Sequence, residues 1–292
     1  MKVLKVHKVT PRGFCLGVVK SIKMAKDALR LYPNKDIYMI GLLVHNKIVV
    51  SELEELGIKM LDDWKIPREE LIKTIPKDSV VILSAHGTNK KVIELANQLG
   101  LICIDTKCEW VLETEQLIEK HLNLGYKVIF IGKENHPETL ALTSLDKENI
   151  YLVTNIEQVN ELNIKCDKIF ATNQTTLSII DTDLIYKAIS LKYPQVLIKN
   201  DICEATYVRQ NAVLQLNEKE IQLLYVVGDK RSNNTMKLVE LGIQKNIRTI
   251  RIDTKNDINL EDLKNVETVA ITAGASTSSV VQNQVIKFLE EL

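Results

Sequence analysis

The chain has 292 residues, 45% of them hydrophobic and 26% charged, and its 38 basic side chains are balanced by 38 acidic ones. A formal net charge of zero excludes a broad electrostatic footprint for nucleic acid or anionic lipid, so we expect no nucleic acid and no membrane as partners. The basic start lacks the apolar stretch of a secretory signal, and the longest apolar run, 37–44, is too short to cross a bilayer, which predicts a cytoplasmic protein.

One pattern occurs three times along the chain. A helix with apolar residues at helical spacing begins at a cysteine, a short apolar strand ending in glycine follows, and a second strand ends in small polar residues. In chain order the helices begin at Cys15, Cys108 and Cys203, the first strands are 37–41, 127–132 and 223–228, and the second strands begin at Val80, Lys168 and Thr268. The cysteines are 93 and 95 residues apart. Such regular spacing predicts an internal repeat.

Alternating strands and helices predict an α/β fold of three pseudo-equivalent modules with mainly parallel sheets. We place the modules at 13–106, 107–200 and 201–292, with an N-terminal strand in 1–12 joining the third module. Ligands of such sheets gather beyond the carboxyl ends of the strands. If the modules surround a pseudo-threefold axis, their cysteines and loops can converge on one point.

The three repeated cysteines are candidate metal ligands. A thiol at a helix N-terminus is favoured as the thiolate, the form that binds metal. The alternative is that each is a small buried hydrophobe. Structural zinc sites use four ligands with close Cys-x-x-Cys pairs, which this chain lacks, whereas iron with inorganic sulfide tolerates wide spacing and would keep one iron open. Cys103 and Cys166 lie in apolar, strand-like contexts, and we expect them to be buried without chemistry.

Seven ordered motifs carry a resemblance that runs through nearly the whole chain. They are Thr10 to Val18, Val44 to Asn46, Ser84 to Gly87, His136 to Glu138, Gln174 to Ser178, Asp201 to Thr206 and Thr272 to Thr277. In these motifs the chain resembles the 4-hydroxy-3-methylbut-2-enyl diphosphate reductases, iron–sulfur enzymes that end the non-mevalonate isoprenoid route.

The resemblance implies a trefoil of three α/β modules around a central 4Fe-4S cluster held by Cys15, Cys108 and Cys203. It implies that two electrons and protons remove an allylic hydroxyl as water, giving isopentenyl and dimethylallyl diphosphate. An electron donor such as ferredoxin or flavodoxin is implied as partner, and the family suggests a monomer or weak dimer.

The resemblance also assigns roles to individual side chains. Glu138 would donate the proton that turns the hydroxyl into water, and its confinement near an anionic cluster and a diphosphate should raise its pKa. His136 and Thr175 resemble the proton-relay and hydroxyl-orienting residues. The remaining substrate-binding candidates, most of them for the diphosphate, are His45, His86, Thr176, Ser232, Asn233, Asn234 and Ser276.

Three positions depart from the family's usual residues. Lys107 and Glu109 change the charge beside Cys108, and Ala141 replaces a glycine, which would move the loop that carries the acid. Two alternatives to the reductase stay open: a non-redox hydro-lyase acting at the same open iron, and, because of the change at Ala141, a catalytically silent paralogue that binds diphosphate or cluster.

Overall fold

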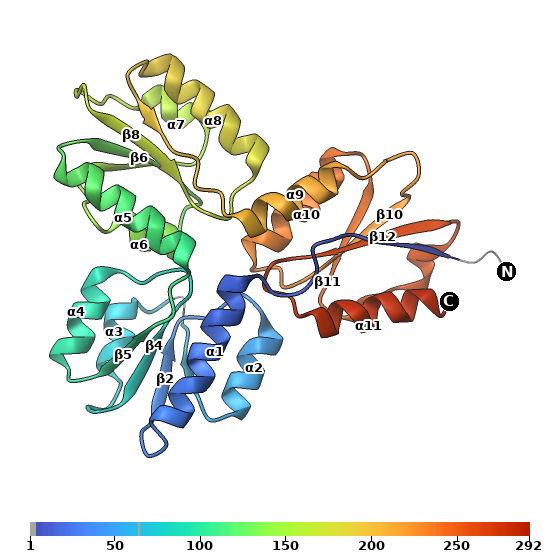
Figure 1. Cartoon of the computed structure of the whole chain (residues 1–292), viewed down its shortest axis with the longest axis horizontal. Helices are drawn as coiled ribbons and strands as arrows, with labels where there is room; N and C mark the ends of the chain where they lie inside the picture. Colours follow the sequence, from blue (N-terminus) through green and yellow to red (C-terminus); the bar gives the residue numbers. More distant parts are fainter. Residues whose placement is uncertain (1–3, 64) are drawn as a thin grey trace. The chain divides into compact units, whose positions relative to one another are not determined.

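The structure, a computed structural model, describes residues 4–63 and 65–292, and the start of the predicted N-terminal strand, residues 1–3, lies outside this part. The described residues form three four-stranded sheets in which every paired strand is parallel to its neighbour (Figure 1). The strands are β1 (Lys5–Lys8), β2 (Ile37–Ile40), β3 (Lys59–Leu61), β4 (Val80–Leu83), β5 (Ile102–Asp105), β6 (Lys127–Ile131), β7 (Ile150–Val153), β8 (Ile169–Asn173), β9 (Leu197–Ile198), β10 (Leu223–Val227), β11 (Arg248–Ile252) and β12 (Thr268–Ala273). The predicted α/β class with parallel sheets is confirmed.

The three sheets share one strand order. They run β3-β2-β4-β5, β7-β6-β8-β9 and β11-β10-β12-β1, so each central pair is made of the two strands that the repeat predicted. The fourth strand in each order, β5, β9 or β1, precedes one of the repeated cysteines in the sequence. The repeat in the sequence is therefore a repeat in topology.

Helices connect the strands. They are α1 (Leu16–Leu31), α2 (Lys47–Glu55), α3 (Arg68–Lys73), α4 (Lys90–Gln98), α5 (Glu109–Asn123), α6 (Pro137–Thr143), α7 (Ile156–Glu161), α8 (Ile179–Lys192), α9 (Glu204–Leu214), α10 (Asn233–Gln244) and α11 (Ser279–Glu290), with short 3₁₀ turns at Lys255–Asp257 and Leu260–Leu263. The predicted helices at the three cysteines are α1, α5 and α9, and each begins one residue after its cysteine.

The central strand β10 shows why these apolar runs become strands buried on both faces. Leu223, Tyr225 and Val227 pack with side chains of α11, whereas Leu224 and Val226 pack with side chains of α9 and α10. Successive side chains of a strand point to opposite faces, so a continuous apolar run satisfies two layers of helices at once.

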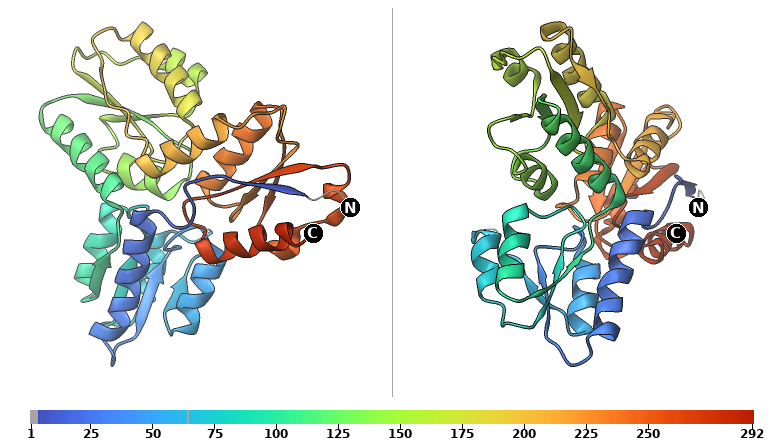
Figure 2. Two further views of the ribbon diagram at one scale, coloured as in Figure 1. Left: turned by 45° about the vertical axis from the view of Figure 1, so that its right-hand side comes forward. Right: turned by 60° about the vertical axis from the view of Figure 1, so that its left-hand side comes forward.

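The chain divides into two compact units. Unit 1 consists of 1–16, 45–47 and 203–292, and unit 2 of 17–44 and 48–202. Unit 1 contains the sheet in which β1 pairs with β12, and the blue N-terminal strand runs beside the red C-terminal one in both views of Figure 2. In the described residues, we find no helix with the length and apolar character that crossing a membrane requires.

Candidate functional site

Two of the repeated cysteines are held by equivalent backbone contacts. In unit 1 the Cys15 amide donates to the Ala275 carbonyl at 3.0 Å, and in unit 2 the Cys108 amide donates to the Ala85 carbonyl at 2.9 Å. Ala275 and Ala85 each lie two residues beyond a central strand, β12 or β4. Each cysteine is therefore fixed at the carboxyl edge of a parallel sheet, where ligands of such sheets bind.

Cys203 and Cys108 occupy the N-cap positions of α9 and α5, and neither thiol serves as the capping acceptor. The Cys203 thiol donates to the Thr206 hydroxyl at 3.1 Å, and Thr206 donates in turn to the Asn234 side chain at 2.7 Å. This chain of hydrogen bonds connects a predicted metal ligand to a predicted diphosphate ligand within unit 1.

Residues 45–47, which we call the 45–47 segment, are held by two loops of unit 1. The side-chain amide of Asn46 donates to the Ser276 carbonyl, and the Ser276 hydroxyl donates to the His45 carbonyl at 3.2 Å. The backbone amide of Lys47 donates to the Asp229 carboxylate at 3.2 Å. The Ser276 hydroxyl also lies 3.4 Å from the Ser232 hydroxyl, so His45, Ser232 and Ser276 share one small region.

Asp229 is ionised in this region. Although burial acts to raise the pKa of Asp229, hydrogen bonds from the Arg231 side chain and backbone, the Arg231 charge and the Lys47 amide lower it to about 2. Arg231 donates to both carboxylate oxygens, through Nε at 3.1 Å and Nη2 at 2.8 Å. The Asp229 carboxylate thus holds both the Arg231 guanidinium and the 45–47 segment beside Ser232.

Glu138 lies in the first turn of α6 and is 1% exposed. Its carboxylate accepts hydrogen bonds from the Thr175 amide at 2.7 Å and from the Thr175 hydroxyl at 3.1 Å. Burial raises the pKa of Glu138 to about 7, against the lowering effect of both Thr175 hydrogen bonds, and the charge of Asp201 raises it further. The predicted direction is confirmed, but its main cause is desolvation by the protein itself.

Two of the histidines of unit 2, His86 and His136, lie edge to face. The rings of His86 and His136 are 5.6 Å apart at an interplanar angle of 84°. His136 caps α6 by accepting the Glu138 amide at Nδ1, which assigns the proton of the neutral ring to Nε2. The Ser84 hydroxyl donates to the Leu42 carbonyl, so at 3.0 Å it accepts from Nδ1 of His86. Hydrogen bonding thus orients both rings.

Gln174 supports this group from the end of β8. Its side-chain carbonyl accepts from the Lys133 amide at 2.9 Å and from the Thr139 hydroxyl at 3.2 Å, and its amide donates to the Thr176 hydroxyl at 2.9 Å. Gln174 is fully buried. One side chain therefore links the loop after β6, the helix that carries Glu138, and the loop that carries Thr175.

Comparison with known proteins identifies the family. The family model described as LytB protein matches residues 6–290 of this chain. The chain belongs to the LytB family. A reductase of 4-hydroxy-3-methylbut-2-enyl diphosphate from Malacoplasma penetrans is 44% identical over 99% of this chain and 98% of its own length. The enzyme of the same name from Bacillus subtilis is 40% identical over 99% of this chain and 91% of its own length.

A solved structure agrees with this membership. The E-1-hydroxy-2-methyl-but-2-enyl-4-diphosphate reductase from Plasmodium falciparum superposes with a TM-score of 0.91 at 30% identity, covering 98% of this chain and 88% of that one. The family that the motifs predicted is confirmed.

This LytB chain accommodates its departures from the usual family residues. The Lys107 amino group pairs with Glu115 and lies 3.7 Å from Asp105, and Glu109 pairs with Lys20, so both added charges have local partners in unit 2. Ala141 is buried in a regular turn of α6, and the Glu138 contacts with Thr175 are present. The expectation that Ala141 displaces the acid-bearing segment has no counterpart in these contacts.

One local expectation for this LytB chain is wrong. Glu138 lies on a helix and not on a loop, because His136 caps α6 and Pro137 fills its first position. Of the two serines assigned to the diphosphate, Ser232 caps α10, whereas Ser276 caps no helix: Ser278 accepts from the Val281 amide and caps α11.

The predicted site residues fall into two groups. Unit 1 contains Cys15, Cys203, His45, Ser232, Asn233, Asn234 and Ser276, and unit 2 contains Cys108, His86, His136, Glu138, Thr175 and Thr176. Their meeting at one centre stays a prediction from the sequence. Across residues 4–63 and 65–292, no three Cys, His, Asp or Glu side chains lie close enough together to hold a single metal ion. In a 4Fe-4S cluster, by contrast, the thiolates bind different irons.

All five cysteines of this LytB chain lie in the described residues and remain thiols. Cys103 is in β5 and Cys166 in a loop, and both are only partly buried, so full burial was a wrong expectation. Sequence reasoning assigned no role to Gln174, Asp201, Arg209 or Asp229, which all carry polar groups into buried positions. No periodicity marks such residues.

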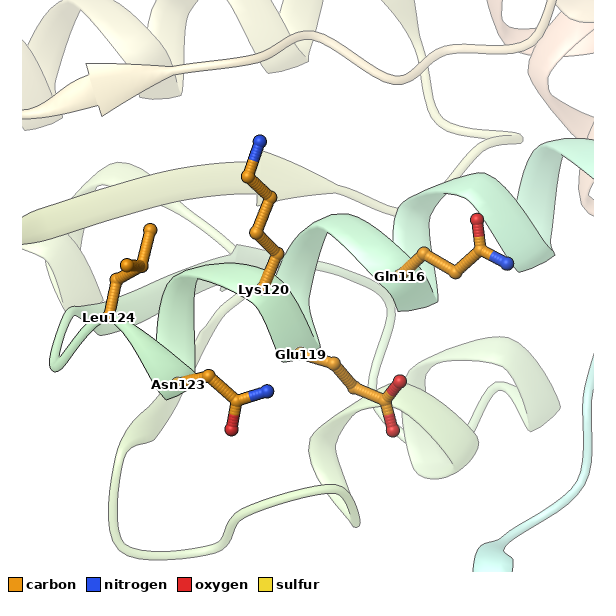
Figure 3. A pocket seen from close by; sticks show the side chains of 5 residues that line it. All are labelled: Gln116, Glu119, Lys120, Asn123 and Leu124. Carbon is orange, nitrogen blue, oxygen red and sulfur yellow. The ribbon is translucent and has the colours of Figure 1, made fainter.

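A separate depression lies on one face of α5 and its end. Gln116, Glu119, Lys120, Asn123 and Leu124 line it (Figure 3). These residues include none of the predicted ligands, acids or diphosphate contacts, so the depression is distinct from the candidate site.

Proposed function

We propose that this chain reduces (E)-4-hydroxy-3-methylbut-2-enyl diphosphate to isopentenyl and dimethylallyl diphosphate. The allylic carbon–oxygen bond breaks, two electrons reduce the allylic group, one proton leaves with the hydroxyl as water, and a second proton adds to carbon. Membership in the LytB family and two full-length relatives bearing the reductase name support this reaction. As a member of this family the chain is an oxidoreductase.

A 4Fe-4S cluster on Cys15, Cys108 and Cys203 is the proposed cofactor. The donor set suits it, because all three thiols directly precede helices and none is in a disulfide. Helix N-termini favour thiolates, the form that binds iron. When bound, the cluster supplies the electrons, which it receives from a ferredoxin- or flavodoxin-like donor.

Glu138 is the proposed proton donor, and its environment is the observation that carries the proposal. A carboxyl with a pKa of about 7 is partly protonated at neutral pH, which suits general acid catalysis. Thr175 donates a hydrogen bond to each carboxylate oxygen of Glu138 and so fixes the orientation of the carboxyl group that carries the proton. His136, which caps the same helix turn, presents its Nε2 proton as the relay.

Diphosphate binding is assigned to both units. In unit 1, Ser232, Asn233 and Asn234 start α10, where amides and the helix dipole favour anions, and Ser276 and His45 lie beside Ser232. In unit 2, His86 and Thr176 are the assigned contacts. His86 has Nδ1 engaged with Ser84, so protonation at Nε2 would give a charged donor to phosphate. A cytoplasmic monomer or weak dimer completes the proposal.

The test is anaerobic purification, counting of iron and sulfide, and turnover of the diphosphate with a chemical reductant. We expect Glu138→Gln to keep the cluster and lose turnover by about 10²-fold or more, the range of general acid catalysis. Glu134→Gln is the matched control, since Glu134 is exposed and four residues away. Full activity in Glu138→Gln would overturn the assignment of the acid.

Two other functions are outcomes of the same assay. Product formation without reductant would favour a hydro-lyase, and a cluster-loaded protein that binds diphosphate without any turnover would favour a silent paralogue. The paired charges at Lys107 and Glu109 and the intact Glu138 contacts favour the active enzyme.

A further inference from the structure

Arg209 is a buried cation that pairs with no carboxylate in the part of the chain that the structure describes. It lies in the second turn of α9 and is 4% exposed. Burial lowers the pKa of the Arg209 guanidinium, and among the described residues the sulfur groups of Cys15 and Cys203 are the ones that act against this effect. A buried charge that lacks a counterion is costly, so a nearby anion is expected.

The guanidinium bridges the two chain segments that carry these cysteines. Its Nη2 donates to the Gly13 carbonyl at 2.8 Å, and its Nη1 donates to the Ala205 carbonyl at 3.0 Å. Gly13 lies two residues before Cys15, and Ala205 lies two residues after Cys203. The flat, rigid fork of arginine suits such a bridge better than the single ammonium group of lysine.

One donor of the bridge is unused. The Nε group of Arg209 is buried and has no hydrogen-bond partner within residues 4–63 and 65–292. Buried donors are almost always satisfied in folded proteins, so an orphan at this place points to an acceptor that binds there. Thiolate or inorganic sulfide would be such an acceptor.

The Gly13 side of the bridge is itself well defined. The Gly13 amide donates to the buried Gln282 side chain at 3.3 Å, and the Cys15 amide donates to the Ala275 carbonyl at 3.0 Å. Gly13 has a φ of +81°, and a Cβ there would lie 3.2 Å from the Ser279 Cβ. These contacts therefore fix the loop at Gly13 in one position, and Arg209 connects α9 to the loop there.

We propose that Arg209 is a positioning residue for the cofactor: it holds the Cys15 and Cys203 segments together, and its charge compensates the anionic sulfur centre they bind. The proposal rests on the proposed function for the identity of that centre. Net charge and hydrogen bonds to sulfur set the potential of iron–sulfur clusters, so loss of this cation should make the cluster harder to reduce.

The first arm measures the midpoint potential of anaerobically reconstituted protein. We expect Arg209→Met to lower the midpoint potential by at least about 59 mV, which corresponds to a tenfold change in the reduction equilibrium of a one-electron couple. Arg209→Lys keeps the charge but not the fork, so its potential stays near wild type while its cluster is lost faster to an iron chelator. Arg248→Gln removes an exposed arginine at the amino end of β11 and controls for net charge.

The second arm needs no cluster. Metal-free protein is treated with iodoacetamide, and alkylation of each cysteine is followed by peptide mass spectrometry, with Cys103 as internal reference. We expect Arg209→Met to slow alkylation of Cys15 and Cys203 several-fold relative to Cys103, because a nearby cation favours the reactive thiolate. Arg209→Lys keeps the charge and therefore the wild-type rates.

The outcomes separate the two proposals. A wild-type protein that takes up no iron or sulfide contradicts the proposed function, and the alkylation arm then decides the role of Arg209. An unchanged potential and unchanged alkylation in folded Arg209→Met overturn the role of Arg209 while leaving the reductase proposal intact. If Arg209→Met does not fold, the role of Arg209 is overturned when Arg209→Lys loses its cluster to the chelator at the wild-type rate.

Discussion

Glu138 shows how one side chain acquires acid chemistry from its surroundings. Position in the first turn of a helix favours the ionised form of a carboxylate, and so do the two hydrogen bonds from Thr175. Burial outweighs both and raises the pKa of Glu138 to about 7. Keeping a proton at this buried carboxyl at neutral pH therefore lowers the stability of the folded protein, and such perturbed groups are common at functional sites.

The raised pKa of Glu138 predicts a pH dependence of stability. Below about pH 4.5 the carboxyl is protonated in both the folded and unfolded states, and the contribution is fully present. Between about pH 4.5 and 7 the folded state binds more protons, so the free energy of unfolding falls as pH rises, by about 3 kcal/mol in all. We expect Glu138→Gln to lack this fall in urea unfolding of the metal-free protein.

The measurement compares unfolding free energies at about pH 5 and pH 8. Glu138→Gln should gain about 3 kcal/mol relative to wild type between these pH values, and the exposed control Glu134→Gln should run parallel to wild type. A constant difference between Glu138→Gln and wild type at both pH values would contradict the buried, protonated carboxyl.

At the scale of elements, polar side chains at strand ends hold the loops of the site. Gln174 at the end of β8 joins the Lys133 loop, α6 and Thr176. In unit 1, Asp229 after β10 holds the 45–47 segment. Apart from the contact with Thr176, these contacts join elements far apart in sequence, so loop geometry depends on a few buried polar groups.

We predict that Gln174→Leu destabilises unit 2. It removes the acceptor of the Lys133 amide and of the Thr139 hydroxyl and the donor to the Thr176 hydroxyl, at a cost of about 3 kcal/mol, since each unsatisfied buried group costs about 1–3 kcal/mol. Chemical unfolding measures the loss. Gln116→Leu, an exposed position on α5, is the control and should change stability little. A near-neutral Gln174→Leu would show that these bonds do not support the loops.

We predict that Asp229→Ala loosens the 45–47 segment. Loss of the carboxylate removes the acceptor of the Lys47 amide and the partner of Arg231. Hydrogen exchange at the Lys47 amide should accelerate, and the KM for the diphosphate should rise, with kcat less affected. Asp253→Ala breaks another Arg–Asp pair of unit 1 and should leave both unchanged. Unaltered exchange in Asp229→Ala would contradict the clamp.

At the scale of the whole molecule, one topology is used three times, and one edge strand of each copy precedes a cysteine at a helix start. Repetition gives two of the cysteines equivalent backbone contacts, those of the Cys15 and Cys108 amides. The module boundaries at 106/107 and 200/201 stay predictions.

We predict that Cys15→Ser, Cys108→Ser and Cys203→Ser each reduce bound iron and sulfide after anaerobic reconstitution, because serine is a poor ligand for iron in such clusters. Cys103→Ser and Cys166→Ser are matched controls and should retain the wild-type content. Equal iron and sulfide in all five variants would refute the proposed ligand set.

The sequence by itself determined the α/β class, the central strands and the helix starts at the three cysteines, because apolar periodicity and capping act over a few neighbouring residues. It also carried the motifs that identify the LytB family. Only the tertiary structure decided the pKa of Glu138 and the hydrogen-bond partners of three buried side chains. These are Gln174, which joins three segments, Asp229, which holds the 45–47 segment, and Arg209, which bridges the segments of Cys15 and Cys203. Burial and hydrogen bonding of these groups depend on residues up to 196 positions away, as for Arg209 and Gly13, and no local pattern encodes such partners.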